Sequence, residues 1–190
     1  MNNNSSEFWS ALEPEYRKAM LFCRKLTGNR ERGDDLFQDS MVQAFSHFES
    51  LRNRKAFRSW LYRIMINRFN SKMRRPLWKR LVPFHPDLHS DLVVEDPVDM
   101  LAAKRLLKFA FQAISSDQQV LVTLHELEGW PINELASLLN KTEGAVKASL
   151  FRARNKMKKA IEQQQKKQSR QVSESKSKKV RASDAVSRSQ

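Results

Sequence analysis

The sequence has little cysteine, glycine or proline, with one cysteine, four glycines and six prolines in 190 residues. The single Cys23 excludes an internal disulfide and a thiolate zinc site. No stretch approaches the ~18 consecutive apolar residues of a membrane-spanning helix. The first residues also lack the basic segment and apolar run of a signal peptide. We therefore predict a cytoplasmic protein without a membrane span.

Apolar residues recur every three or four positions along most of the chain, which indicates an all-α fold. A proline-rich segment near the middle and a collapse of apolar content near the end divide the sequence. We predict two small helical domains, at residues 5–76 and 98–165, joined by a flexible linker at residues 77–97. Residues 166–190 are rich in lysine, arginine and serine, and they are expected to form a disordered basic tail.

Three helices are expected in the first domain, at about residues 15–26, 32–48 and 57–75. Gly28 is placed to end the first helix, and Pro76 follows the third. The apolar spacing buries one face of each helix against the others. The side chains expected on these faces are Tyr16, Ala19, Met20, Cys23, Leu26, Phe37, Met41, Ala44, Phe45, Phe48, Phe57, Trp60, Leu61, Ile64 and Met65.

A helix-turn-helix is predicted in the second domain, at about residues 131–159. Ser116 is expected to open a capping box at the start of the preceding helix. Pro131 suits the first turn of the next helix, Asn140 tolerates the left-handed backbone of a sharp turn, and Thr142 can cap the final helix. The preceding helix is expected to bury Val120, Leu121, Leu124 and Leu127. The final helix is expected to bury Val146, Leu150, Ala153, Met157 and Ile161.

The charge of the chain favours a polyanionic partner, because 35 lysines and arginines against 21 acids leave a net charge of +14. A three-residue turn between closely packed helices, the second of them basic, is typical of a motif that inserts one helix into the DNA major groove. Without the turn, the same charges would equally fit a solvated face. Base edges are expected to face Glu143, Lys147, Ala148 and Phe151, and phosphates to face Arg152 and Arg154.

The helix expected at residues 57–75 interleaves aromatic and basic side chains, which suits single-stranded nucleic acid. Aromatic rings stack on unpaired bases while the cations follow the phosphates. Phe57 and Trp60 fit a core position better than a binding role. Tyr62 and Asn67 lie off the apolar stripe and are expected to contact a base. The cations expected beside the strand are Arg63, Lys72, Arg74 and Arg75.

These motifs together resemble bacterial sigma factors of the extracytoplasmic-function (ECF) group, within the RNA polymerase sigma factor family, over about residues 8–162. The matching segments of the first domain are residues 34–39, 44–45, 60–64 and 67. Those of the second are residues 124–129, 134–136, 144, 146–147 and 150–154. Each segment is weak alone, but their shared order and spacing are specific. Many relatives carry Ser-Arg where this chain has Ala148-Ser149, which makes the promoter sequence harder to infer.

The resemblance implies a sigma factor that binds core RNA polymerase and directs it to promoters. Asp35, Gln38 and Asp39 would dock on the clamp helices of the largest polymerase subunit, although the aspartates also suit the first turns of a helix. The first domain would capture the separated strand of the minus-ten element, with Asn67 near a flipped base. The helix-turn-helix would read the minus-thirty-five duplex, and its domain would rest on the polymerase flap. An anti-sigma factor is a further possible partner.

Two other interpretations remain open at this point. A nucleic-acid enzyme would need catalytic chemistry, and possible metal ligands come together only at His85, Asp87, His89 and Asp91. These residues lie in a proline-broken segment without cysteines, so no metal, cofactor or catalytic residue is predicted. A stand-alone helix-turn-helix regulator would share the second domain, but the aromatic-basic helix of the first favours the sigma factor. The tail is expected to be a solvated extension or to add nonspecific DNA affinity.

Overall fold

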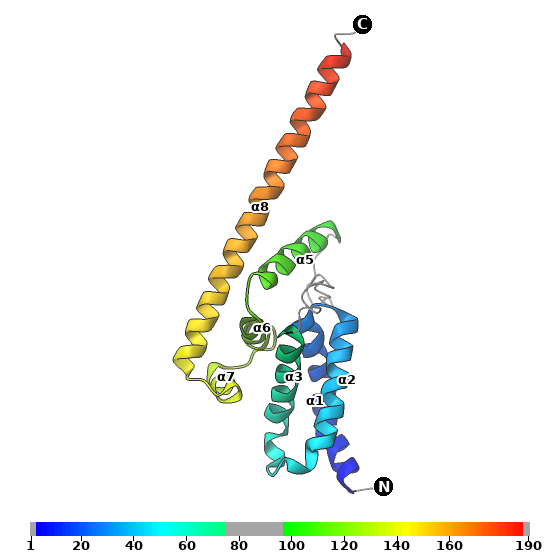
Figure 1. Ribbon diagram of the computed structural model, residues 1–190, viewed down its shortest axis with the longest axis vertical. Coiled ribbons are helices and arrows are strands. Elements are labelled where there is room, and N and C mark those ends of the chain that lie inside the picture. Colours follow the sequence, from blue (N-terminus) through cyan, green and yellow to red (C-terminus); the bar gives the residue numbers. More distant parts are fainter. Residues whose placement is uncertain (1–2, 75–96, 188–190) are drawn as a thin grey trace.

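A computed structural model describes residues 3–74 and 97–187 (Figure 1). Within these ranges every regular element is helical, which confirms the predicted all-α fold. The α-helices are α1 (Asn3–Thr27), α2 (Arg30–His47), α3 (Phe57–Arg74), α5 (Pro97–Gln112), α6 (Ser116–Val122), α7 (Ile132–Leu139) and α8 (Glu143–Ser187). Short 3-10 turns at Phe48–Ser50 and Arg54–Ala56 precede α3, and a π-helical turn at Thr123–Leu127 extends α6. None of the described helices is both long and apolar enough to span a bilayer.

Helices α1, α2 and α3 form the N-terminal domain, and two glycines set the approach of the first two. Gly28 has a φ of 61° and follows the end of α1, as its position in the sequence predicts. A Cβ atom on Gly33 would lie 2.5 Å from the Cα of Arg24, so only glycine permits the observed approach of α2 to α1. The crossing is therefore specified by the backbone as well as by side-chain packing.

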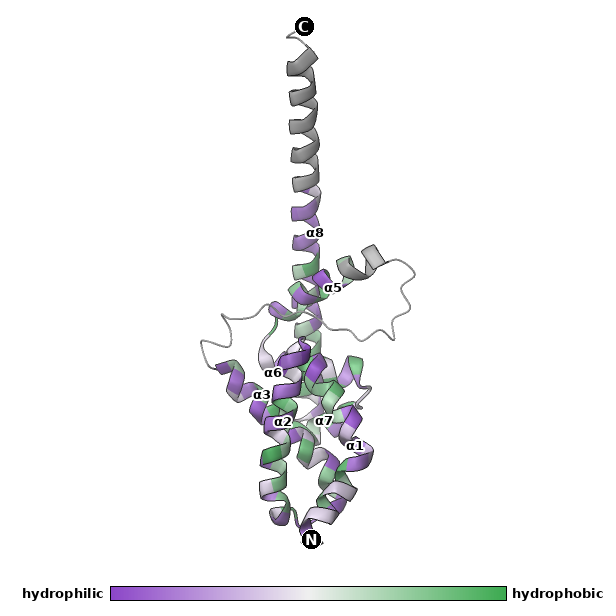
Figure 2. Ribbon diagram, turned by 90° about the vertical axis from the view of Figure 1, so that its right-hand side faces the viewer, coloured by the Kyte–Doolittle hydropathy of each residue, from purple (hydrophilic) through white to green (hydrophobic). Residues whose placement is uncertain are grey.

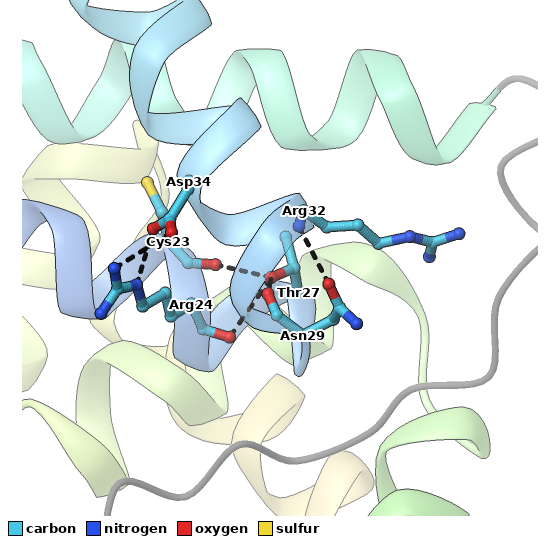
Figure 3. A network of polar contacts seen from close by, with 6 residues as sticks. All are labelled: Cys23, Arg24, Thr27, Asn29, Arg32 and Asp34. Atoms are coloured by element: carbon cyan, nitrogen blue, oxygen red, sulfur yellow. Dashed lines mark hydrogen bonds and ion pairs between the residues drawn. The ribbon is translucent and has the colours of Figure 1, made fainter.

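Polar side chains fix the turn between α1 and α2 (Figure 3). The side chain of Asn29 accepts a hydrogen bond from the backbone N–H of Arg32 at 2.9 Å, which caps α2. The guanidinium of Arg24 donates to both carboxylate oxygens of Asp34, at 2.6 and 3.0 Å. The hydroxyl of Thr27 donates to the carbonyl oxygen of Asn29 at 2.9 Å. These contacts determine where α2 begins and therefore which of its side chains face outward.

The core of the N-terminal domain is aromatic. The ring of Phe8 meets Phe48 and Phe57 edge-on, at centroid distances of 5.3 and 6.0 Å. Cys23 is fully buried, with its Sγ 3.3 Å from the Sδ of Met65. Burial raises the pKa of the Cys23 thiol far above its usual value, so this side chain stays protonated and acts as a small apolar group.

Helix α1 is longer than its sequence pattern predicts. It begins at Asn3 and continues through Pro14, whereas the periodicity indicates a start near Glu15. Phe8 and Leu12, each 1% exposed, anchor the additional turns in the core. Burial of these two side chains outweighs the backbone hydrogen bond that a proline removes from a helix interior.

Three large side chains expected in the core are more exposed than predicted. Tyr16 and Phe45 are 46% and 45% exposed, and each contacts the domain through a ring edge, against Phe37 and Phe8 respectively. Leu127, expected on the stripe of the helix that includes α6, is 36% exposed. The π-helical turn explains Leu127, because its extra residue per turn rotates this side chain away from the stripe.

Helices α5 to α8 form the C-terminal domain, and a capping box begins α6. Ser115 is the N-cap, with its hydroxyl 3.3 Å from the backbone N–H of Gln118, whose side chain accepts from Ser115 N–H at 3.2 Å. The predicted box at Ser116 is therefore one residue too late. Gln119, the other possible partner, instead donates to the carbonyl oxygen of Phe111 at 2.9 Å.

The two domains pack against each other, with α3 lying beside α6 and α7 (Figure 1). At the centre of the interface, the rings of Tyr62 and Trp130 lie 4.8 Å apart and are 1% and 2% exposed. The Arg58 guanidinium lies 4.2 Å from the centroid of the Trp130 ring. At one edge Lys25 pairs with Glu128 at 2.8 Å. The interface thus combines a buried aromatic centre with charged contacts.

Helix α8 continues beyond both domains, and its turns just beyond them are mostly hydrophilic (Figure 2). The basic segment that follows Gln165 is part of this helix, whose bounds are Glu143–Ser187. Gly144 is the only glycine in this stretch, which contains no proline. Lysine, glutamine, arginine and alanine are good helix formers, so a segment too polar to build a core still lacks any residue that stops the helix.

Candidate nucleic-acid interface

The helix-turn-helix has the geometry that its sequence predicts. Leu135 is buried in the face of α7 that packs into the domain. Asn140 adopts the left-handed conformation with a φ of 52°, and the next N–H, of Lys141, donates to the carbonyl oxygen of Ala136 at 2.9 Å. The hydroxyl of Thr142 accepts from the N–H of Ala145 at 3.2 Å and caps α8. The turn is therefore short, and hydrogen bonds of Lys141 and Thr142 hold it in place.

The first turns of α8 separate a buried face from an exposed one. Val146, Leu150 and Ala153 are at most 1% exposed, as predicted. The six residues expected to meet duplex DNA all lie on the exposed part of this helix: Glu143, Lys147, Ala148, Phe151, Arg152 and Arg154. Phe151 is 64% exposed, which is unusual for a phenylalanine, because the opposite face of the same helix packs into the core.

Two of the three cations among these six residues have ion-pair partners. Lys147 lies 3.6 Å from the Glu143 carboxylate, one turn away, with both side chains more than half exposed. The Nε of Arg154 donates to Glu126 of the π-helical turn at 2.9 Å. Exposed pairs of this kind contribute little to stability, so the cations can exchange a carboxylate for a phosphate at small cost. Both pairs hold the cations at the exposed surface.

Helix α3 carries the residues expected at single-stranded DNA, and their environments differ. Arg63, Asn67 and Arg74 are exposed. Lys72 is mostly buried and pairs with Asp39 of α2 at 2.8 Å. The ring of Tyr62 is 1% exposed and packs between Phe22 and Trp130, so it is not available to a base in this arrangement. Arg75 lies outside the described residues.

The domain interface places the α3 surface against the first helix and the turn of the helix-turn-helix. The guanidinium of Arg63 donates to the carbonyl oxygens of Ser137 and Leu138 at the end of α7, at 3.3 and 3.2 Å. Asn67 lines a cavity of about 290 Å³ that also reaches Asn140 of the helix-turn-helix. The α3 surface thus lies against the end of α7, next to the turn that leads into α8.

A third exposed surface lies on α2. Asp35 and Gln38 are exposed, as expected, and Asp39 is about half exposed in its pair with Lys72. The structure adds Val42, 68% exposed, which continues the same helix face. Phe45, predicted to be inward, continues it by one more turn. Residues 35, 38, 42 and 45 follow one another at spacings of three and four, which places them on one face of a helix. This spacing is the signal by which the sequence could have revealed the whole surface.

Carboxylates beside exposed apolar side chains are typical of a surface that contacts protein rather than DNA, which would repel the acids. The described residues contain no group of three or more histidine, cysteine, aspartate or glutamate side chains that could hold a metal ion. His85 and His89, weighed above as metal ligands, lie outside those residues. The two surfaces on α3 and α8 and the surface on α2 are therefore the candidates for function.

Comparison with protein families identifies both domains. Residues 12–79 match Sigma-70 region 2, and residues 104–157 match Sigma-70, region 4. The first match contains α2 and α3, and the second contains the helix-turn-helix and ends within α8. Together the two matches cover more than half of the chain.

Proteins that are similar to this chain in sequence are sigma factors. The ECF RNA polymerase sigma factor SigG of Mycobacterium tuberculosis is 25% identical over 176 residues, covering 80% of this chain and 48% of SigG. The ECF RNA polymerase sigma-E factor of Haemophilus influenzae is 29% identical over 139 residues, covering 67% of this chain and 74% of the relative. The chain thus spans about half the length of SigG and about three quarters of that sigma-E factor.

A solved structure supports the same architecture. The sigma factor RpoE of Bartonella quintana, determined in complex with the anti-sigma factor NepR, superimposes with a TM-score of 0.60. The match covers 82% of this chain and 96% of RpoE at 22% sequence identity, so it shows the shared fold. With both Sigma-70 regions matched in order over more than half of the chain, the chain belongs to the sigma-70 family, and the relatives reported above are sigma factors of the extracytoplasmic-function group.

Proposed function

We propose that this chain binds core RNA polymerase and directs promoter-specific initiation as an ECF sigma factor. One observation carries the proposal: a single chain combines a protein-binding type of surface on α2 with two separate basic surfaces, on α3 and α8. A stand-alone helix-turn-helix regulator needs only the last of these. The expected partners, polymerase and promoter DNA, place this activity in the cytoplasm.

The α2 surface is the proposed contact with the clamp helices of the largest polymerase subunit. Asp35, Gln38 and Asp39 would supply charged and polar contacts, and the exposed Val42 and Phe45 would supply apolar area beside them. Apolar area drives association, while the carboxylates add orientation and specificity. The C-terminal domain is proposed to rest on the polymerase flap.

The α3 surface is proposed to hold the separated strand of the minus-ten element. Asn67 is exposed and carries an amide that can hydrogen-bond the edge of an unpaired base. Exposed Arg63 and Arg74 can follow the phosphates, with Lys72 once it releases Asp39. Arg75 remains a proposed phosphate contact from the sequence alone. Tyr62 is proposed to reach DNA only after the domain interface opens.

The exposed face of α8 is proposed to read the minus-thirty-five element in the major groove. Lys147, Ala148 and Phe151 lie near the beginning of the helix, where groove-inserted helices present side chains to base edges. Glu143 can accept a hydrogen bond from a cytosine amino group. The remaining residues of this face, Arg152 and Arg154, are proposed to contact phosphates.

Use of both DNA surfaces at once requires the domains to separate. Arg63 is bound to the carbonyl end of α7, and Lys25 is paired with Glu128 across the interface. The residues between Arg74 and Pro97 could span about 75 Å if fully extended. Polymerase would hold the opened domains at the spacing of the two promoter elements. An anti-sigma factor, the class of partner present in the RpoE structure, would compete for the same surfaces.

Reconstitution tests the proposed function directly. The full chain, mixed with bacterial core polymerase and a promoter library, should yield run-off transcripts from a defined subset of templates. Core polymerase alone should yield none of them. If the chain binds core polymerase in pull-down but no template gives a specific transcript, the proposed function is wrong.

Asn67→Ala separates DNA capture from polymerase binding. This variant should slow open-complex formation by roughly 10-fold or more, because one discriminating polar contact contributes about 1–3 kcal/mol. Permanganate footprinting of unpaired thymines measures the opened strand, and co-purification measures polymerase binding, which should change less than twofold. Asn133→Ala, at an exposed asparagine of α7, is the matched control. If the Asn67 variant instead loses polymerase binding, Asn67 belongs to the contact with polymerase, and its proposed role at DNA is wrong.

A further inference from the structure

Helix α8 carries a row of cations beyond the segment that matches region 4. Lys159, Lys166 and Arg170, here called the distal basic stripe, are exposed. They continue, at intervals of four or seven residues, the helix face that begins with Ala148 and Arg152. The region-4 match ends at residue 157, so the stripe lies outside the segment that this chain shares with the family.

The stripe lies on the side of α8 that points away from the protein. Val146, Leu150 and Ala153 define the buried side, and Met157 packs partly against the same core. The residues of the stripe occur half a turn away from these positions. The face proposed to enter the major groove therefore extends directly into the stripe, without a change of direction along the helix.

The cations of the stripe take part in none of the ion pairs formed by the described side chains. Among the residues that the structure describes, Lys159, Lys166 and Arg170 have no ion-pair partner. Glu162 is the only acid in the sequence between Glu143 and Glu174. Like charges one turn apart on a helix, such as Lys166 and Arg170, repel each other and destabilise it slightly. A polyanion that contacts this face would remove that repulsion.

We propose that the distal basic stripe binds phosphates of duplex DNA next to the element read by the beginning of α8. This inference rests on the proposed function, because the recognition face must lie on DNA first. From Arg152 to Arg170 the helix covers about 27 Å at 1.5 Å per residue, enough to pass a flanking phosphate row. The stripe adds a sequence-independent, salt-sensitive component to duplex binding.

Adjacent lysines on α8 provide a matched pair of variants. Lys159→Gln with Lys166→Gln removes two charges from the stripe, and Lys158→Gln with Lys167→Gln removes two charges from the flanks of the same helix. All four lysines are exposed, and lysine and glutamine have similar helix propensities. Circular dichroism should confirm equal helix content. A difference in DNA binding between the two double variants then reports the position of the charge.

The measurement is fluorescence anisotropy of a labelled 40-base-pair mixed-sequence duplex with the full chain, over a series of salt concentrations. Loss of the two stripe lysines should make the slope of log K against log salt shallower by about 1.8, at 0.9 per phosphate contact. The flank variant should change the slope by less than half as much. Equal changes, or none in either variant, would overturn the proposal. If the stripe variant binds core polymerase more weakly but keeps the wild-type slope with DNA, the stripe contacts protein. That outcome would also overturn the proposal.

The transcription assay keeps this inference distinct from the proposed function. If the wild-type chain gives specific transcripts and the two double variants have equal slopes, the proposal for the stripe is wrong. The proposed function would still stand. A slope difference without any specific transcript would support the stripe as a DNA contact and reject initiation. Both results come from the same purified proteins.

Discussion

Asp35→Arg is expected to raise the Kd for core RNA polymerase by roughly 30-fold or more. The exposed carboxylate of Asp35 lies on the α2 surface beside Gln38, and replacing it reverses the charge presented to the partner. Removing one partner of a charged contact across an interface costs about 2–5 kcal/mol, and 1.4 kcal/mol corresponds to tenfold in affinity. Titration of labelled core polymerase measures the effect.

Glu13→Arg is the matched control for this reversal. Glu13 is an exposed acid of α1 and belongs to none of the three proposed surfaces. It should change the Kd for polymerase less than threefold. If both reversals weaken binding equally, the effect reflects overall charge, and the α2 surface is not the docking site. The free energy of unfolding of both variants should remain within about 0.5 kcal/mol of wild type, as is usual for surface changes.

Phe48→Ala is expected to lower the free energy of unfolding by about 3–5 kcal/mol, the usual cost of truncating a buried phenylalanine. Phe48 is 1% exposed, packs edge-on against Phe8 and Phe57, and lies under the Arg54 guanidinium at 3.9 Å. In a domain of this size the melting midpoint should fall by more than about 10 °C. Thermal and urea unfolding followed by circular dichroism measure both quantities.

Phe151→Ala makes the same chemical change at an exposed site. Phe151 is 64% exposed on α8, so the melting midpoint should move by less than about 2 °C. Its loss should instead weaken binding to promoter DNA that contains the minus-thirty-five element. A stable Phe48 variant would contradict the aromatic core, and an unstable Phe151 variant would contradict the exposed recognition face.

Local sequence signals predict the helix-turn-helix well. The left-handed Asn140, the cap at Thr142 and the buried positions of α8 all depend on residues within two turns of one another. The capping box shows the limit of such signals. Ser115 with Gln118 and Ser116 with Gln119 fit the pattern equally, and only the hydrogen bonds of Gln119 in the folded domain decide between them.

Contacts between distant segments account for what sequence patterns predict poorly. Tyr62 lies off the stripe of its own helix, so its pattern indicates exposure, yet Trp130 of the other domain covers it. Phe45 fits an inward position by spacing, but Phe8 already fills the core beside it. For the candidate site, the sequence identifies the helices and most of their exposed residues. It does not reveal that Arg63 meets the end of α7.

The contact between Tyr62 and Trp130 also has a thermodynamic consequence. If polymerase and DNA bind only the separated domains, the apparent dissociation constant equals the intrinsic one divided by the fraction of molecules that are open. Each 1.4 kcal/mol of stability in the closed interface then weakens apparent binding tenfold. Substitutions at Trp130, outside the α2 surface, would therefore change the apparent affinity for polymerase by changing the fraction of open molecules. The contacts with polymerase itself would stay the same.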